Sequence, residues 1–195
     1  AVPLDENTFV LELFHGPSLA FKDFGARFMS RVMGYYLKDG EQLLDVLVAT
    51  SGDTGGAVAL GFLGVANTRV TILYPKGKVS PIQEQQLTTL GQNIRAIEID
   101  GTFDDCQALV KQAFADEELN QKFRLTSANS INISRLIPQT FYYFNAFAQL
   151  KRKGFSVVEA TCQEDIDDFV SIYYETMNRV NAKPEYFFSK EYFKS

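Results

Sequence analysis

A lysine among aromatic residues is the first feature of this sequence that could do chemistry. Lys22 lies between Phe21 and Phe24, close to the only histidine in the sequence, His15. An amine becomes a nucleophile when its neutral form is populated, and desolvation by apolar neighbours has that effect. Since most lysines are solvated, composition alone leaves two interpretations open: a reactive amine, or a lysine on the polar face of a helix.

A glycine-rich turn is the second such feature. Residues 50–56, TSGDTGG, follow a continuous apolar run and precede a segment of small residues. A strand that ends in such a turn and opens a helix presents backbone N–H groups at the positive end of the helix dipole. The turn therefore suits a carboxylate or a phosphate, although its spacing is neither that of a Walker loop nor that of the dinucleotide fingerprint. The candidate binding residues are Ser51, Gly52, Thr54 and Gly55, with Asp53 as an acceptor among these donors. The alternative is a tight turn without a ligand.

A third polar cluster lies in residues 126–135, TSANSINISR, at the predicted start of a helix. Small hydroxyl and amide side chains with one arginine a turn later are what a phosphate prefers. The candidate residues are Ser127, Asn129, Ser130, Asn132 and Arg135. The alternative is a capping cluster with a surface arginine. Lys76, which follows another strand, is a weaker candidate.

Alternating strands and helices must position these residues. Apolar runs predict strands over 45–50, 69–75, 94–100 and 123–128. Helices are expected between them, because repeated β-α units form a parallel sheet with helices on its faces. The carboxyl ends of parallel strands share one edge, where such folds bind their ligands. We therefore expect the polar clusters to meet at that edge.

Capping and periodicity predict where three of the helices begin. Ser80 with Gln83 three residues later has the capping-box pattern, and Pro81 stands at the first helical position. Ser18 is expected to cap an earlier helix whose apolar face carries aromatic residues at three- and four-residue spacing. That face comprises Phe21, Phe24, Phe28, Val32 and Tyr36. A long helix is expected from about Asn132, with Pro138 in its first two turns.

The bulk composition excludes several classes of protein. The chain has 195 residues, of which 46% are hydrophobic, and its net charge is −5. This is ordinary globular composition without the basic patches that nucleic acids or anionic membranes require. One histidine and two cysteines have no zinc-ligand spacing, so no metal site is expected. No leader peptide and no apolar stretch long enough to span a bilayer is evident, which favours a cytoplasmic protein.

Four segments together resemble one enzyme family. They are LELFHGPSLAFKDFGARFM, ATSGDTGGAVA, ILYPKGKVSPIQEQQLTTLG and SANSINISRLIPQ. Over residues 1–150 the sequence resembles threonine synthase, a family of pyridoxal-phosphate enzymes of fold type II. The resemblance implies an α/β fold, a partial three-layer αβα arrangement with a mainly parallel sheet.

The resemblance also implies a role for each candidate residue. Lys22 of the AFKDFG motif would join its amine to the carbonyl of pyridoxal 5'-phosphate and act as the catalytic residue. The loop Ser51–Gly55 would hold the substrate carboxylate and the cofactor ring, with Asp53 near the phenolic oxygen of the ring. The cluster at residues 127–135 would face the substrate phosphate. The implied lyase reaction, which belongs to threonine biosynthesis, converts O-phosphohomoserine and water to threonine and phosphate.

The last 41 residues of the sequence, 155–195, have a different pattern from the rest. Residues 155–195 predict a short strand, a Thr161–Glu164 capping box and an amphipathic helix. This β-α-α segment is similar to the opening of an acyltransferase domain of the GNAT or Fem type. We therefore expect a chimera, in which residues 151–154 join two partial pieces, and self-association through exposed apolar surface. The glycine-asparagine loop that grips the cofactor phosphate in the resembled family is not found in the sequence. Two alternatives to an active enzyme stay open: a non-catalytic anion-binding fragment, and an acyltransferase-related fusion.

Overall fold

The fold is taken from a computed structural model. The residues that it describes are 1–3, 6, 9–40, 42–129, 132–156, 162–179, 181–182, 184 and 187–194. They divide into two compact units, residues 1–149 and residues 150–195, and each is described by itself.

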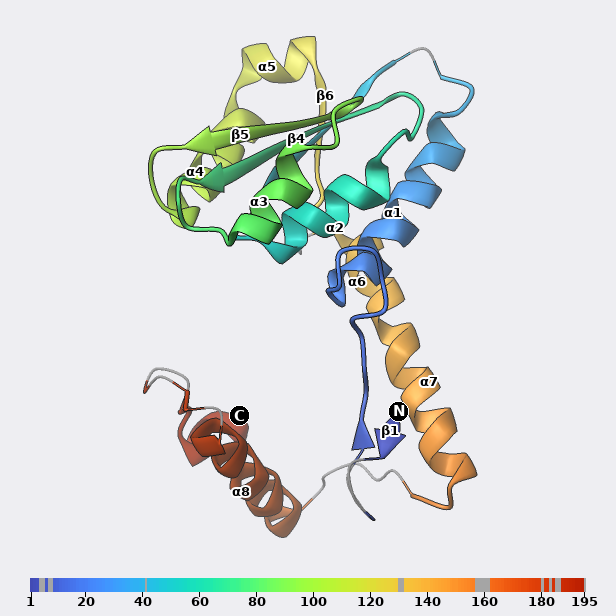
Figure 1. The fold of residues 1–195 in the computed structure, drawn as a ribbon, viewed down its shortest axis with the longest axis vertical. Helices are drawn as coiled ribbons and strands as arrows, with labels where there is room; N and C mark the ends of the chain where they lie inside the picture. The colour runs from blue at the N-terminus through green and yellow to red at the C-terminus, as the bar shows by residue number, and fades with distance from the viewer. Residues whose placement is uncertain are drawn as a thin grey trace. The chain divides into compact units, whose positions relative to one another are not determined.

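A four-stranded parallel sheet is the centre of the first unit (Figure 1). Its strands are β3 (Leu44–Ala49), β4 (Thr68–Pro75), β5 (Ile94–Ile99) and β6 (Arg124–Ser127), in the spatial order β5-β4-β3-β6. Each neighbouring pair is parallel. The predicted α/β class with a mainly parallel sheet is confirmed, and each predicted strand is found within two residues of its expected ends.

Helices cover both faces of this sheet. The helices α1 (Lys22–Leu37), α2 (Asp53–Phe62) and α3 (Pro81–Thr88) pack their buried residues with Val46 and Val48, which point to one face. The opposite face carries Leu47 and Ala49, which pack against α4 (Phe103–Ala115). Because side chains alternate along a strand, consecutive apolar residues of β3 serve two separate cores. A short helix, α5 (Glu117–Lys122), then leads into β6.

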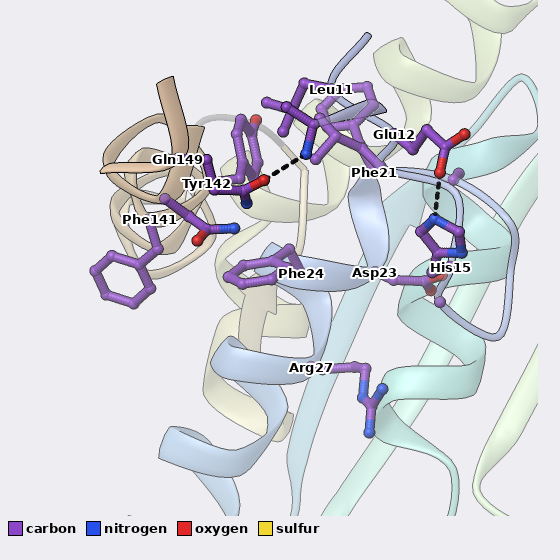
Figure 2. Close-up of a pocket in the computed structure, with 15 residues that line it drawn as sticks. Leu11, Glu12, His15, Phe21, Asp23, Phe24, Arg27, Phe141, Tyr142 and Gln149 are labelled. Carbon is purple, nitrogen blue, oxygen red and sulfur yellow. Dashed lines mark hydrogen bonds and ion pairs between the residues drawn. The ribbon is translucent and has the colours of Figure 1, made fainter. Parts of the chain in front are cut away.

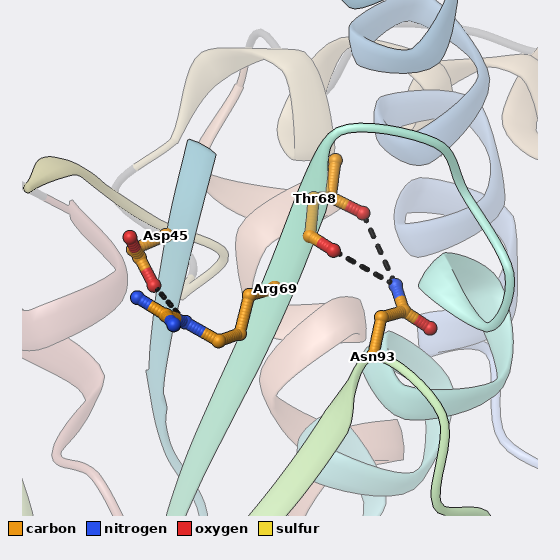
Figure 3. A network of polar contacts seen from close by, with 4 residues as sticks. All are labelled: Asp45, Thr68, Arg69 and Asn93. Atoms are coloured by element: carbon orange, nitrogen blue, oxygen red, sulfur yellow. Dashed lines mark hydrogen bonds and ion pairs between the residues drawn. The ribbon is translucent and has the colours of Figure 1, made fainter. Parts of the chain in front are cut away.

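Polar contacts fix the amino ends of the central strands (Figure 3). Arg69 Nε donates to Asp45 Oδ1, and the two residues are register partners on β4 and β3. Asn93 Nδ2 donates to both the carbonyl and the hydroxyl oxygen of Thr68, at 3.2 Å each. These contacts lie at the edge opposite to the predicted site, so they hold the register without occupying that site.

The start of α1 differs from the expectation. The helix begins at Lys22, and no side chain caps it. Ser18 is therefore not the cap: its backbone N–H donates to Asp23 Oδ2 at 2.9 Å, which ties the preceding turn to the first turn of the helix. Lys22 is consequently the first residue of α1, where a side chain can leave the helix end and reach a neighbouring loop.

The predicted apolar face of α1 is also wrong. The helix buries Gly25, Ala26 and Met29, whereas Phe28 and Tyr36 are exposed. Small residues face inward because α1 packs closely on α2: a β-carbon on Gly61 would lie 3.2 Å from the Ala26 backbone. Only small side chains permit such an approach, and the large aromatic ones turn outward.

The predicted long helix is interrupted at its proline. The chain forms α6 (Ile133–Leu136), a 3₁₀ turn η1 (Ile137–Gln139) and then α7 (Thr140–Arg152). Pro138 has no N–H to donate and its ring crowds the preceding turn, so a regular helix cannot pass through it. Two short strands, β1 (Val2–Pro3) and β2 (Phe9–Val10), form an antiparallel pair near the start of the chain.

The second unit contains α8 (Gln163–Arg179) and the 3₁₀ helix η3 (Lys190–Lys194). Aromatic side chains join them, and Tyr174 Oη donates to the Phe188 carbonyl at 2.7 Å. The predicted strand over 155–160 and the Thr161 cap lie largely outside the described residues. The division into residues 1–150, 151–154 and 155–195 stays a prediction.

Candidate active site

The chain order of the sheet places a crevice between two strands. From β3 the chain proceeds outward to β4 and β5, and it then returns through α4 and α5 to β6 on the other side of β3. The strands that lie between β3 and β6 in the chain, β4 and β5, are thus both on the other side of β3, and ligands of open α/β sheets bind at the carboxyl ends of strands where the chain order changes in this way. A pocket of about 150 Å³ lies at this place. The predicted site residues that line it are Lys22, Ser51, Thr54, Asn129 and Arg135.

Lys22 has the surroundings of a reactive amine. Its Nζ lies 4.1 Å from the centroid of the Phe21 ring. Burial lowers the pKa of Lys22, the Arg135 guanidinium lowers it further, and the Asp53 carboxylate opposes both. Phe24, the other expected neighbour, instead packs edge-on against Tyr142. The lowered pKa populates the neutral amine at a lower pH than that of a solvated lysine, which favours the reactive interpretation.

Arg135 is the most deeply buried charged residue of the pocket. Its side chain is 2% exposed, and Nη1 donates to the Ala128 carbonyl at 2.6 Å. Its Nε has no hydrogen-bond partner among the described residues. Burial lowers its pKa, but a guanidinium stays charged in proteins. Arg135 is thus a buried cation with one unsatisfied N–H group, and the Lys22 amine lies in the same pocket. A bound anion would satisfy that N–H group and balance the buried charge.

The turn between β3 and α2 is organised by Thr50, which was not among the predicted site residues. Its Oγ1 accepts from the N–H of Gly52 at 3.0 Å and from that of Gly55 at 2.8 Å. Gly52 has φ +147°, a conformation that favours glycine. This internal bonding folds the turn tightly and leaves Ser51 and Thr54 on the pocket wall. A threonine directly before a Ser-Gly turn is the signal that could have identified this role.

The polar cluster after β6 is mostly structural. Asn129 extends the sheet: its Nδ2 donates to the Ala49 carbonyl at 2.8 Å, and its Oδ1 accepts from the Ala49 N–H. Asn132 caps α6, and Ser127 bonds to Asn129. The capping alternative is therefore correct for Asn132, while Asn129 and Ser127 bind the end of β3 and each other. Its prediction of a surface arginine is wrong, because Arg135 is buried and is the cluster's charged donor in the pocket. Asn129 still lines the pocket.

Two further candidates are placed differently. Lys76 is exposed after β4 and does not line the pocket of Lys22. Ser130 lies outside the described residues. Phe103 and Gln107 of α4 line the pocket without having been predicted. Since α4 follows β5, which β4 separates from β3, the sequence offered no local signal for them.

A larger pocket of about 570 Å³ lies beside α1 and α7 (Figure 2). Its walls include Leu11, Phe24 and Tyr142, and the Ala1 ammonium donates to Gln149 Oε1 at 2.7 Å at its rim. His15 lines this pocket and lies 3.0 Å from Glu12 Oε2. Lys22 is not among the lining residues, so the histidine and the lysine that are close in sequence belong to different pockets.

Within the described part of the chain, no cluster of histidine, cysteine and acidic residues has the arrangement of a metal site. No described helix has the length and the apolar character needed to cross a membrane.

Comparison with known proteins decides the family. The family model described as "Pyridoxal-phosphate dependent enzyme" matches residues 4–189. The chain belongs to this family. Its description names the same cofactor as the one implied by the sequence motifs.

Curated members of this family extend the resemblance. The chain is 59% identical to the threonine synthase of Haemophilus influenzae over 150 residues, which cover 77% of this chain and 35% of that protein. It is 61% identical to the Serratia marcescens threonine synthase over 144 residues, which cover 74% of this chain and 33% of that protein. The predicted resemblance to threonine synthase is confirmed. The chain spans about a third of the length of these relatives.

Solved structures of the family confirm the fold. The Escherichia coli threonine synthase matches with a TM-score of 0.71 and 57% identity, covering 76% of this chain and 34% of that one. The Brucella melitensis enzyme, solved as PLP-bound threonine synthase, matches with a TM-score of 0.73 and 46% identity, covering 80% and 34%.

Proposed function

We propose that this chain carries out, or forms part of, a threonine-synthase reaction: the pyridoxal-phosphate-dependent conversion of O-phosphohomoserine and water to threonine and phosphate. The observation that carries the proposal is the meeting of Lys22 and Arg135 in one pocket at the carboxyl ends of β3 and β6. The amine of Lys22 suits reaction with the carbonyl group of the cofactor. The buried guanidinium of Arg135 suits binding of the phosphate that leaves the substrate.

The residues of the pocket fit pyridoxal phosphate at its carbonyl end. Lys22 would join the cofactor, because its lowered pKa makes the neutral amine available. Asp53 stands at the first position of α2, close enough to Lys22 to affect its pKa, where it would face the ring's phenolic oxygen. When bound, the cofactor supplies an electron-withdrawing ring that stabilises negative charge on carbon beside the amino-acid nitrogen.

The chain's own groups divide the remaining work. The hydroxyls of Ser51 and Thr54 would bind the substrate carboxylate at the start of α2. Gly52 and Gly55, whose N–H groups donate to Thr50 Oγ1, would serve the same site by holding the turn in shape. Lys22 Nζ would move a proton between the α and β carbons of the substrate once it is released from the cofactor. Arg135 would donate to the phosphate as negative charge develops on it. Lys76, Ser127, Asn129, Ser130 and Asn132 complete the proposed substrate-binding set.

A non-catalytic anion-binding role is the second candidate, and the pocket volume favours it. At about 150 Å³ the pocket accommodates a phosphate or carboxylate group. It is smaller than the roughly 300–1,000 Å³ of ordinary small-molecule sites. The chain would then bind the anionic part of a ligand without performing the reaction. The acyltransferase-related fusion has no described site residue in its favour.

Phosphate release tests the proposal. The purified chain is mixed with pyridoxal phosphate and O-phosphohomoserine, and inorganic phosphate and threonine are measured together. The proposal predicts that both appear in equal amounts and that neither appears with Lys22→Ala. Binding of inorganic phosphate or O-phosphohomoserine, with neither product formed and no pyridoxal phosphate bound, would select the anion-binding candidate. A biosynthetic enzyme of this kind would act in the cytoplasm, as the sequence predicts.

A further inference from the structure

Gln83 lies against the turn that carries Asp53, although it belongs to a different helix. It stands in the first turn of α3, and its Nε2 donates to Asp53 Oδ1 at 2.8 Å. A β-carbon added to Gly52 would collide with the Gln83 amide, so the same side chain also covers the neighbouring residue of the turn. Two separate observations thus place this amide directly on residues 52–53.

The other end of the same amide is fixed by the helix cap. Gln83 Oε1 accepts from the Ser80 N–H at 3.0 Å, and the Gln83 N–H donates to Ser80 Oγ at 3.3 Å. A capping box holds both partners in one geometry. The cap uses the amide oxygen and thereby orients the amide NH₂ group, which donates to the Asp53 carboxylate.

Asp53 in turn acts on Lys22. Two charged groups affect the pKa of the Lys22 amine: the Arg135 guanidinium lowers it, and the Asp53 carboxylate raises it. A carboxylate at an exposed helix start has several side-chain rotamers available. The hydrogen bond from Gln83 to Asp53 Oδ1 restricts these rotamers and so fixes where the negative charge lies.

We infer that Gln83 is a positioning residue, whose amide holds the Asp53 carboxylate in place within the turn that forms one wall of the Lys22 pocket. The inference rests on the proposed function in so far as Lys22 is the reactive amine. It adds a residue of a second helix to the proposed site, because the capping box of α3 orients Gln83 and, through Asp53, affects the pKa of Lys22.

Competitive labelling of Lys22 tests this inference without any cofactor. Acetic anhydride reacts with neutral amines, so the pH dependence of Lys22 acetylation, read by peptide mass spectrometry, gives the pKa of this amine. Gln83→Met should lower the Lys22 pKa, and so raise its acetylation rate at a fixed pH below that pKa, since a released Asp53 carboxylate no longer stabilises the ammonium as well. Asp53→Asn should also lower it, and Gln83→Met should add nothing in the Asp53→Asn background.

Ser80→Ala is the matched control for a purely structural role. It removes the hydroxyl of the same capping box and should lower the melting temperature as Gln83→Met does, but it leaves the amide on Asp53 and should leave the Lys22 pKa unchanged. Gln85→Met, an exposed substitution on the same helix, should change neither quantity. The inference is overturned if Gln83→Met leaves the Lys22 pKa at its original value, if it shifts that pKa equally in the Asp53→Asn background, or if Ser80→Ala shifts it as much. Because no pyridoxal phosphate is present, a failure here is distinct from a failure of the proposed function.

Discussion

Among single residues, Arg135 has the clearest influence on the candidate site, because its charge is buried beside Lys22. A guanidinium keeps its charge inside a protein, and this positive charge lowers the pKa of a neighbouring amine because it disfavours the ammonium form. The structure places Arg135 where it does this to Lys22, and leaves one of its own N–H groups without a partner among the described residues. The same arginine therefore favours the neutral amine and attracts an anion.

Replacing this arginine should change the pH profile of Lys22 in a defined direction. Arg135→Met removes a positive charge, so the ammonium form of Lys22 becomes more stable and its pKa rises. At a fixed pH below that value, less neutral amine is present and Lys22 reacts more slowly. Competitive acetylation across the pH range measures the shift.

Two controls accompany this measurement. Arg135→Lys keeps a positive charge and should retain part of the lowering, whereas Arg27→Met, an exposed residue that lines the larger pocket, should have no effect. An unchanged Lys22 pKa in a folded Arg135→Met protein would show that the two cations do not interact as described.

The β3–α2 turn is the decisive element of the site. Its geometry depends on Thr50, which satisfies two backbone N–H groups, and on Gly52, whose φ of +147° a side chain rarely adopts. The element, rather than any one side chain, orients Ser51 and Thr54 toward the pocket.

Gly52→Ala tests this element. The substitution imposes an unfavourable backbone conformation and a collision with Gln83, and should lower the free energy of unfolding by about 2–3 kcal/mol. Gly77→Ala is the matched control: φ is +61°, but no atom lies within 4 Å of the added carbon, so about 1 kcal/mol is expected. Urea unfolding of the two variants gives the comparison. Equal losses would mean that the Gln83 contact contributes nothing.

The sequence predicted the elements better than their ends. The four strands and the Ser80–Gln83 capping box are found as expected, because apolar runs and local capping chemistry depend on near neighbours. The start and the buried face of α1 were wrong, because the close packing of α1 on α2 decides them and that contact is distant in sequence. For the same reason the motifs identified Lys22 and Arg135 but not Thr50 or Gln83, whose roles depend on contacts across the turn and between helices.

Exposed apolar side chains are a property of the first unit as a whole. Phe24 and Phe28 of α1 meet Phe141 of α7 edge-on, yet all three remain more than a third exposed. Phe144, further along α7, is 71% exposed. Apolar surface of this kind favours association in water, which supports the self-association expected from the sequence.

Sedimentation velocity at increasing concentration tests this association. The chain should show a rising average mass, and Phe144→Glu should reduce it because a charge is costly to bury in an apolar contact. Ile82→Glu, on α3 and 69% exposed, is the control and should leave the association intact. A monomer at all concentrations would contradict the prediction.

Borohydride trapping on Lys22 tests the central claim most directly. The chain is incubated with pyridoxal phosphate, reduced with borohydride and digested, and the modified peptide is identified by mass spectrometry. The label is expected on Lys22, and Lys22→Ala should not be labelled above the background of its other lysines. Lys76→Ala, which removes an exposed lysine outside the pocket, should be labelled as the unaltered chain is. A label spread over exposed lysines, with no preference for Lys22, would contradict the central claim.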